Sequence, residues 1–138
     1  MSVSCLVFLQ DDKLPTIAQW QAALDRVNVG IVLEHVDDLR THVGFIPATY
    51  GGHPSGFEWF YGPVSDNYGG DPPEGLGNLS HVADLVTHSD MREAVCSSLA
   101  GTVLTQLADG LSLDEDSGEV VNGDAALKVA REYELHLR

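Results

Sequence analysis

Three residues of the chain have the types and the spacing that acid–base chemistry requires. Arg40 and His42 stand two positions apart, and Glu58 lies on a segment that is expected to pair with the one following His42. A half-buried glutamate beside a histidine can act as an acid–base pair, so the sequence allows a small enzyme with its site at this hairpin. The alternative, which we favour, is that the three side chains form a buried ion pair and hydrogen bond that fix the hairpin.

Other residue patterns that carry chemistry do not occur in the chain. Ser80 directly precedes His81, and neighbouring side chains on a strand point to opposite faces, so we expect no nucleophile and base there. The six histidines follow neither the HExxH nor the HxH spacing, and neither glycine pair leads into a helix with a nearby lysine for phosphate. Cys5 and Cys96 lie in apolar runs and are expected to be small buried side chains. We therefore predict no metal, no cofactor and no enzymatic activity.

The segment from Trp59 to Gly77 combines aromatic and acidic residues and contains no lysine or arginine. Aromatic side chains often anchor protein interfaces, and carboxylates at the rim attract a basic partner. The alternatives are that Trp59 belongs to the hydrophobic core and that the loop carboxylates only face solvent. The residues predicted to bind a partner are Trp59, Tyr61, Asp66, Tyr68, Asp71 and Glu74.

Charge is the most unusual property of the composition. The chain has 21 acidic and 7 basic residues, which give a formal net charge of −14. No lysine or arginine occurs between Arg40 and Arg92, or between Arg92 and Lys128. Nucleic acids and anionic membranes bind proteins mainly through Lys and Arg, so both are disfavoured as partners. A basic protein partner is favoured, because complementary charges speed encounter; the alternative is that the acidity only keeps the protein soluble.

The length and the mixture of residues predict one folded domain. The 138 residues, of which 43% are hydrophobic and 20% charged, suit a single α+β domain over residues 1–138. No apolar stretch approaches the ~20 residues that span a bilayer, and no secretion signal is recognisable, so we expect a cytoplasmic protein. We expect a monomer or a homodimer. A third functional alternative is a structural protein that dimerises through Trp59 or an apolar helix stripe.

The first part of the chain predicts two strands that flank a helix. Ser4–Leu9 is a β-prone run, and apolar residues recur at helical spacing over 17–27, after a proline (Pro15) that suits the first turn of a helix. Asn28 is expected to help close this helix before a second strand at 31–36. The pattern is that of a βαβ unit, and an arrangement with another strand between the two is equally allowed.

The rest of the chain predicts a hairpin, a long loop and two more helices. The hairpin covers residues 43–64 around a connector at 51–55, and places Glu58 as a half-buried carboxylate. The other expected elements are a loop at 62–77, a strand at 79–88, a helix from Asp90 that ends at Gly110, strands at 111–113 and 119–121, and a last helix capped by Asp124. We predict about five strands in a mixed or antiparallel sheet with three helices.

Three segments of the N-terminal half, taken together, resemble those of a known kind of protein. They are Leu14–Trp20, Leu39–Pro47 and Ser55–Trp59. They are similar to segments of small acidic bacterial immunity proteins, the cognate inhibitors of secreted toxins, over roughly residues 3 to 61. The resemblance implies a protein that blocks a toxin domain by covering its active site. Immunity proteins bind through variable loops, so the resemblance transfers no functional residue by position. The expected function is an acidic, non-enzymatic inhibitor of a basic protein.

Overall fold

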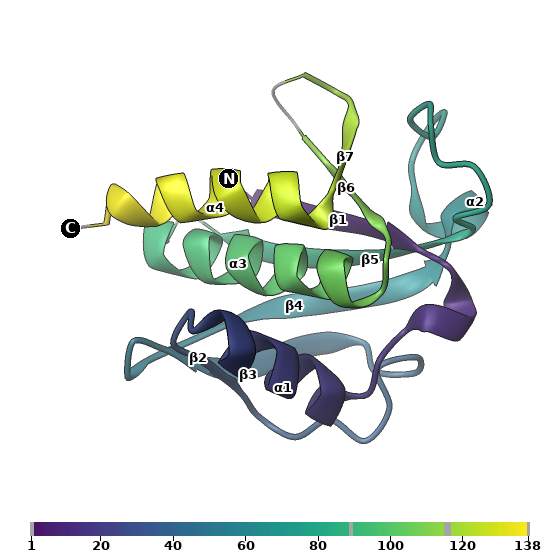
Figure 1. The fold of residues 1–138 in the computed structure, drawn as a ribbon. Coiled ribbons are helices and arrows are strands. Elements are labelled where there is room, and N and C mark those ends of the chain that lie inside the picture. Colours follow the sequence, from purple (N-terminus) through teal and green to yellow (C-terminus); the bar gives the residue numbers. More distant parts are fainter. Residues whose placement is uncertain (1, 89, 115–116, 138) are drawn as a thin grey trace.

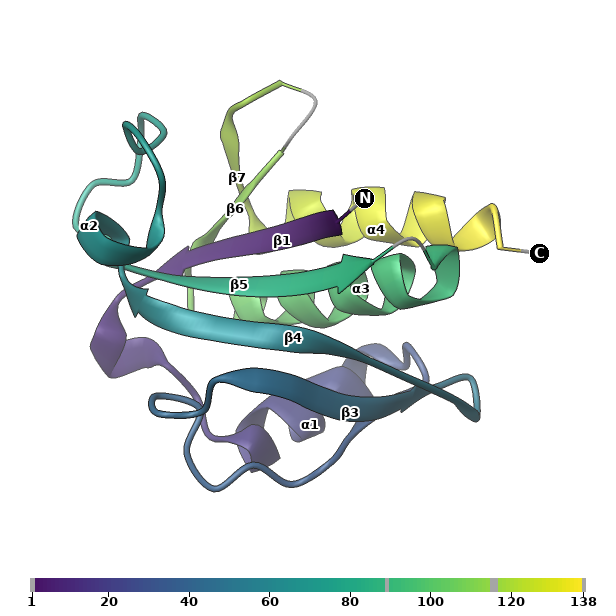
Figure 2. The same ribbon diagram turned by 180° about the vertical axis from the view of Figure 1, so that it is seen from behind.

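The fold is built on one β-sheet with helices on one of its faces. The computed structural model describes residues 2–88, 90–114 and 117–137, which form a single α+β domain. Helices α1, α3 and α4 cover the near face of the sheet in Figure 1. The view from behind shows the opposite face of the sheet without a covering helix (Figure 2). The strands are β1 (Ser2–Leu9), β2 (Ile31–Leu33), β3 (Gly44–Tyr50), β4 (His53–Pro63), β5 (His81–His88), β6 (Leu111–Leu113) and β7 (Val120–Asn122). The helices are η1 (Asp11–Lys13, a 3-10 turn), α1 (Ile17–Val27), α2 (Val64–Asn67), α3 (Met91–Leu107) and α4 (Gly123–Leu135).

The strand order is β2-β3-β4-β5-β1-β6-β7, and every neighbouring pair is antiparallel. The predicted α+β class is confirmed, but the expected five strands and three helices were too few for the described residues. The two three-residue strands β6 and β7 join the main sheet through β1. The short helix α2 lies inside the segment 62–77, which was predicted to be a loop. No described helix is long and apolar enough to cross a bilayer.

β1 and β2 flank α1 in the chain but are far apart in the sheet. Three strands, β3, β4 and β5, lie between them, so the split arrangement is the observed one. α1 begins with a capping box, in which the side chains and backbones of Thr16 and Gln19 bond each other. Pro15 therefore precedes the cap, and the expectation that it occupies the first helical turn was wrong. Asn28 closes the helix in the left-handed conformation, with φ 56°.

The predicted hairpin is formed by β3 and β4. Its turn consists of Gly51 and Gly52, with φ of 59° and 81°, and this pair of positive angles is what a two-residue hairpin turn requires. The expected connector at 51–55 was too long, because His53 already pairs with Tyr50. Gly56 belongs to β4 and has φ 142°, and the ring of Phe45 covers it, 2.5 Å from where a Cβ would stand.

Two predicted helix boundaries also need correction. Gly110 does not end α3 through a left-handed conformation, because Asp109 takes that role with φ 52°. A glycine is needed at position 110 for a different reason: a Cβ there would overlap the Phe8 carbonyl oxygen. At α4 the capping residue is Asn122, whose side chain accepts a hydrogen bond from the Ala125 amide, and not Asp124.

α3 is the centre of the hydrophobic core. It packs against β1, β4 and β5 on the sheet and against α1 and α4 at its sides. Most of its residues from Val95 to Thr105 are buried, so this part of the helix is covered around most of its circumference, as expected of a helix enclosed by other elements. Trp20 of α1 completes this core and donates an indole hydrogen bond to the Ala100 carbonyl oxygen at 3.0 Å.

Candidate functional site

Trp59, a predicted partner-binding residue, lies in the core. β4 is paired on both sides in the middle of the sheet, and its Trp59 side chain points toward α1 and α3 with 0% exposure. The indole nitrogen donates to the Leu39 carbonyl oxygen at 2.9 Å, and the ring lies 5.6 Å from that of Trp20. Because it is buried, Trp59 cannot anchor an interface in this fold. The alternative, that Trp59 belongs to the hydrophobic core, is the one observed.

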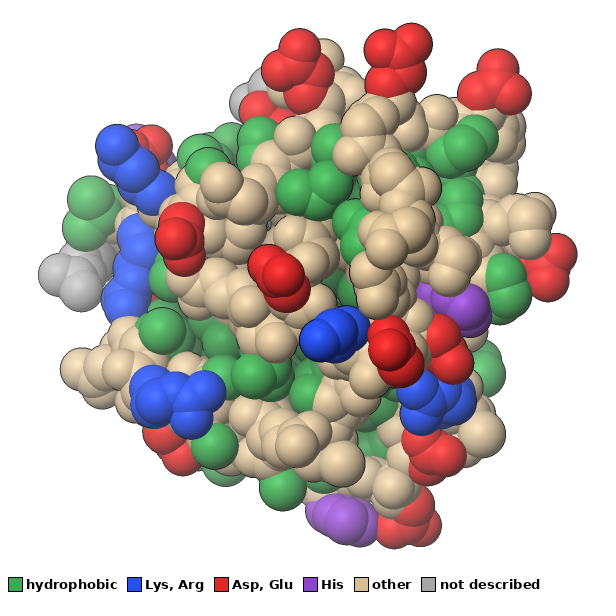
Figure 3. Space-filling view, turned by 45° about the vertical axis from the view of Figure 1, so that its right-hand side comes forward, with side chains coloured by type: hydrophobic (Ala, Val, Ile, Leu, Met, Phe, Trp, Pro, Cys, Tyr) green, Lys and Arg blue, Asp and Glu red, His purple; other side chains and the backbone are tan. Residues whose placement is uncertain are grey.

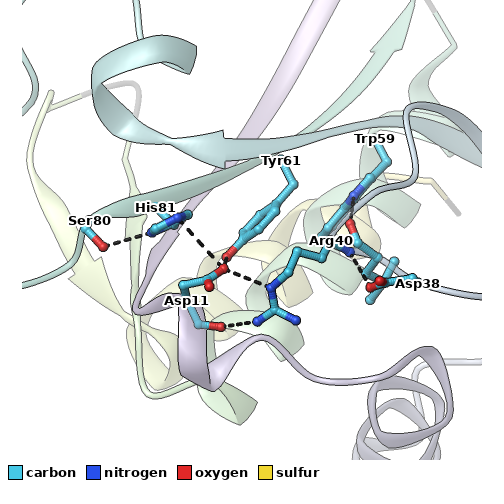
Figure 4. A network of polar contacts seen from close by, with 8 residues as sticks. Asp11, Asp38, Arg40, Trp59, Tyr61, Ser80 and His81 are labelled. Atoms are coloured by element: carbon cyan, nitrogen blue, oxygen red, sulfur yellow. Dashed lines mark hydrogen bonds and ion pairs between the residues drawn. The ribbon is translucent and has the colours of Figure 1, made fainter.

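The ring of Tyr61 lies next to that of Trp59, and the Tyr61 side chain belongs to a polar network (Figure 4). Its ring stacks on Trp59 at 6.1 Å, and its hydroxyl donates to the Asp11 carboxylate at 2.6 Å. Burial, followed by this hydrogen bond, raises the pKa of Tyr61 above its usual value, so the phenol stays protonated. The same hydrogen bond is the main reason that the pKa of Asp11 is lowered, and Asp11 is therefore ionised near neutral pH.

Ser80 and His81 are the second part of the network. Ser80 Oγ lies 2.8 Å from Nδ1 of His81, and Nε2 of His81 lies 3.8 Å from Oδ1 of Asp11. The expectation that adjacent serine and histidine point apart was wrong, because β5 begins only at His81 and strand alternation does not apply to Ser80. The residue types are those of a hydrolase triad. However, 3.8 Å is too long for the hydrogen bond that orients a catalytic imidazole, so we assign the network to the fold.

Arg40, His42 and Glu58 are not brought together. Arg40 Nε donates to the Asp11 carboxylate at 3.1 Å, while His42 Nε2 lies 3.2 Å from the Phe45 carbonyl oxygen. Glu58 lies on the open face of the sheet, opposite Trp59, with its carboxylate 3.4 Å from Nε2 of His88. The acid–base site proposed from the sequence is therefore not assembled in this structure. The alternative of a single buried ion pair is wrong as well, since the Arg40 and Glu58 side chains are 46% and 40% exposed.

The remaining predicted residues lie in the segment from α2 to β5. Asp66, Asp71 and Glu74 are exposed, as a role in binding requires. Tyr68 is half-buried and packs on Phe8 with ring centroids 5.9 Å apart, which holds the segment against the end of β1. Of the six predicted binding residues, the three carboxylates are thus accessible and the three aromatic rings serve packing.

A second acidic segment stands beside the first and was not predicted to belong with it. The β6–β7 hairpin carries Asp114 and Glu119, and its backbone is closed by a hydrogen bond from the Asp114 amide to the Glu119 carbonyl oxygen at 2.8 Å. A Cβ added to Gly75 would stand 3.5 Å from the Val120 side chain, so the two segments lie close to each other. Both rise from the same end of the sheet in Figures 1 and 2. The acidic positions 115 and 116 of the sequence lie outside the described residues.

We call the described carboxylates of these two segments the acidic rim. Figure 3 shows acidic side chains along the top edge of the molecule, where these segments project. The sequence signal for the second segment was its acidic composition without lysine or arginine, but spacing along the chain did not show that the two segments lie close together. The members of the acidic rim are Asp66, Asp71, Glu74, Asp114 and Glu119.

Other site types find no support in the described residues. Within 2–88, 90–114 and 117–137, no three His, Cys, Asp or Glu side chains gather as a metal site would require. Cys96 is buried, and this burial raises the pKa of its thiol to about 11, so it does not present a reactive thiolate. Comparison of the chain with protein-family models, with curated proteins and with solved structures finds no match.

Proposed function

We propose that this protein is a non-enzymatic inhibitor that binds a basic protein through the acidic rim, in the way that an immunity protein covers the active site of a toxin domain. The observation that carries the proposal is that two acidic segments, distant in the chain, lie close together at one end of the fold. Since neither segment contains a lysine or arginine, a basic surface would approach the rim without repulsion.

The charge of the whole molecule supports the same function. A net charge of −14 attracts a basic protein over a range longer than direct contact and disfavours nucleic acids and anionic membranes as partners. We propose that the protein acts in the cytoplasm without a cofactor, as a monomer or a homodimer. The enzyme alternative is not favoured, because Arg40, His42 and Glu58 have separate partners.

The test compares two charge-reversal variants against the basic proteins encoded by the neighbouring genes. The rim variant carries Asp66→Lys, Asp71→Lys and Glu74→Lys. The matched control carries Asp12→Lys, Glu34→Lys and Glu132→Lys, three exposed carboxylates on other elements. Both variants change the net charge equally, so a difference between them reports the position of the charges.

Association is measured by surface plasmon resonance at low and at physiological salt. We expect the rim variant to associate roughly ten-fold more slowly than the control at low salt, and to lose much of the salt dependence. Equal association rates for the two variants would remove the rim from the function. A neighbouring basic protein that binds neither variant nor the parent would contradict the inhibitor proposal for that partner.

A further inference from the structure

The edge of β1 that faces away from β5 is only partly paired. β1 pairs with β5 along its whole length, from Ser2 to Leu9. On its other side it pairs with β6 at Val7 and Phe8 alone, because β6 and β7 turn away from the sheet. Within the described residues, the edge from Ser2 to Leu6 thus has no strand beside it. Figure 2 shows α4 as the next element beyond this edge.

The backbone groups on this edge point outward in a known register. The Phe8 carbonyl oxygen points toward β6, since a Cβ on Gly110 would overlap it. In an antiparallel sheet, alternate residues direct both their N–H and C=O groups to the same side of the strand. Leu6 and Ser4 therefore direct their backbone groups to the unpaired edge. An edge of this kind is a template for one more strand.

An apolar groove lies directly beside the same edge. It is an open cavity of about 460 Å³ between β1, α3, α4 and the β6–β7 hairpin. Its walls include four of the large hydrophobic side chains that the structure leaves exposed, which are Val3, Met91, Val129 and Tyr133. Val3 and Cys5 enter it from alternate positions of β1, so side chains of an added strand would meet it at the same spacing of two.

The charge at the groove identifies the kind of strand that fits. Asp114 is the one charged side chain among the described residues that line it, and it directly follows β6, the strand that pairs with Val7 and Phe8 of β1. Asp114 is also a member of the acidic rim, so the groove continues the surface to which we assign the basic partner. A strand seated here meets apolar walls along its length and a carboxylate at one end.

We propose that the groove takes an extended segment of the partner protein, which adds as a strand to β1 between Ser2 and Leu6. Its alternate apolar side chains enter the groove, and a Lys or Arg at one end faces Asp114. The segment is that of a basic partner and not β1 of a second copy, because Ser2–Leu6 contains no Lys or Arg that could face Asp114. The inference rests on the proposed function only in assigning the segment to a basic partner.

The test selects peptides of about ten residues, the upper range of strand length, from a random displayed library against the intact protein. We expect enriched sequences to alternate β-branched or aromatic residues with polar ones and to end in Lys or Arg. One enriched peptide is then synthesised, and its affinity is measured for the parent and for two pairs of variants by isothermal titration calorimetry.

Each pair contains a blocking variant and a matched control. Ser4→Pro removes the N–H that points to the unpaired edge and spares the pairing with β5, whereas Ser4→Ala keeps that N–H. Val129→Glu puts a charge into the groove, whereas Val43→Glu puts the same charge on a valine that is 72% exposed and outside the lining. Circular dichroism of all four variants confirms that they fold.

We expect both blocking variants to weaken peptide binding by roughly ten-fold or more, and both controls to leave it within about two-fold. Failure to enrich any sequence, or enriched peptides that bind all four variants alike, overturns the inference. A parent protein that is a dimer, and that becomes a monomer on Ser4→Pro, would assign the edge to a second copy and overturn it as well. Peptide selection uses no basic partner, so its failure is separate from failure of the rim experiment.

Discussion

At the scale of single residues, the polar network around Asp11 shows how side chains with catalytic types can serve the fold. Asp11 receives hydrogen bonds from Tyr61 and Arg40, which come from β4 and from the segment between β2 and β3. The sequence correctly placed Trp59 and Tyr61 on the same face of a strand. It did not show which face α1 and α3 cover, because alternation along a strand reports shared faces and not what packs on them.

The Tyr61–Asp11 hydrogen bond is expected to stabilise the protein. Tyr61→Phe removes the hydroxyl and leaves the ring on Trp59, so we expect a loss of about 1 kcal/mol in the free energy of unfolding at pH 7. Urea denaturation followed by fluorescence measures this loss. Tyr133→Phe is the control, because Tyr133 is 46% exposed and lies on α4, away from the network. Equal losses for the two variants would contradict a special role for the Tyr61 hydroxyl.

The stability difference between the parent and Tyr61→Phe is also expected to depend on pH, and the sign of this dependence can be derived. The pKa of Asp11 is lowered in the folded protein, chiefly by the Tyr61 hydroxyl, relative to about 3.9 in the unfolded chain. Its contribution to stability is therefore fully present above the unfolded pKa and is lost as the pH falls through the folded one. We expect the stability difference between parent and Tyr61→Phe to shrink as the pH falls from about 5 through the unfolded pKa and toward the lowered pKa of the folded state. A difference that stays constant over this range would contradict this account of Asp11.

At the scale of elements, the turn residues predicted where the β3–β4 hairpin turns better than they predicted how long its connector is. Gly51 and Gly52 marked the hairpin correctly, but the following residues His53 to Ser55 also suit a turn by composition and were excluded from the strand. Pairing with β3 extends β4 through these residues. This pairing depends on the neighbouring strand, and nothing in the residues from His53 to Ser55 themselves indicates it. For this reason the sequence pattern assigns them to the connector.

Gly52 is expected to be needed for its backbone conformation and not for space. A Cβ at Gly52 would meet nothing within 4 Å, but the residue has φ 81°, where side chains are strained. Gly52→Ala should therefore lower the free energy of unfolding by about 1 kcal/mol. Gly69→Ala is the matched control, because Gly69 also has open space but no left-handed φ. If urea denaturation shows equal stability for the two variants, the conformation of Gly52 is not the cause.

The close approach of α3 to β1 makes a second prediction at this scale. A Cβ on Gly101 of α3 would overlap the Cys5 sulfur. Gly101→Ala should therefore destabilise the protein by about 1–3 kcal/mol through overpacking. Adding Cys5→Ala removes the sulfur, so the double variant should lose less than the sum of the two single losses. Additive losses in denaturation experiments would show that Gly101 and Cys5 do not compete for the same space.

At the scale of the whole molecule, the acidic rim is a property that no single segment displays. The charge of −14 and the lysine- and arginine-free stretches were evident from composition. The proximity of Gly75 to Val120 brings together segments about 45 residues apart and follows from the strand order, in which β6 and then β7 come after β1. Local patterns of hydrophobicity identified the class of fold but did not define that order.

The net charge predicts how the folded state responds to salt. Like charges repel more strongly in the compact state than in the unfolded chain, and dissolved ions screen this repulsion. We expect the midpoint of thermal unfolding to rise by several degrees when NaCl is increased from about 0.01 M to about 0.3 M. Differential scanning calorimetry measures this shift, and the rim charge-reversal variant should show a smaller one. A midpoint that falls with NaCl would contradict a folded state limited by self-repulsion.

The interior position of β1 in the sheet has a consequence for biosynthesis. Its partners are β5 and β6, and Val7 pairs with Ser112, a residue that the ribosome adds much later. The nascent β1 must therefore wait without its sheet neighbours while most of the polypeptide is translated. Pairings between residues far apart in sequence slow folding. Newly made molecules therefore expose the apolar Val7–Leu9 stretch for longer than does a protein whose contacts join residues close in sequence. Newly synthesised chains are accordingly expected to depend on chaperone capture during this interval.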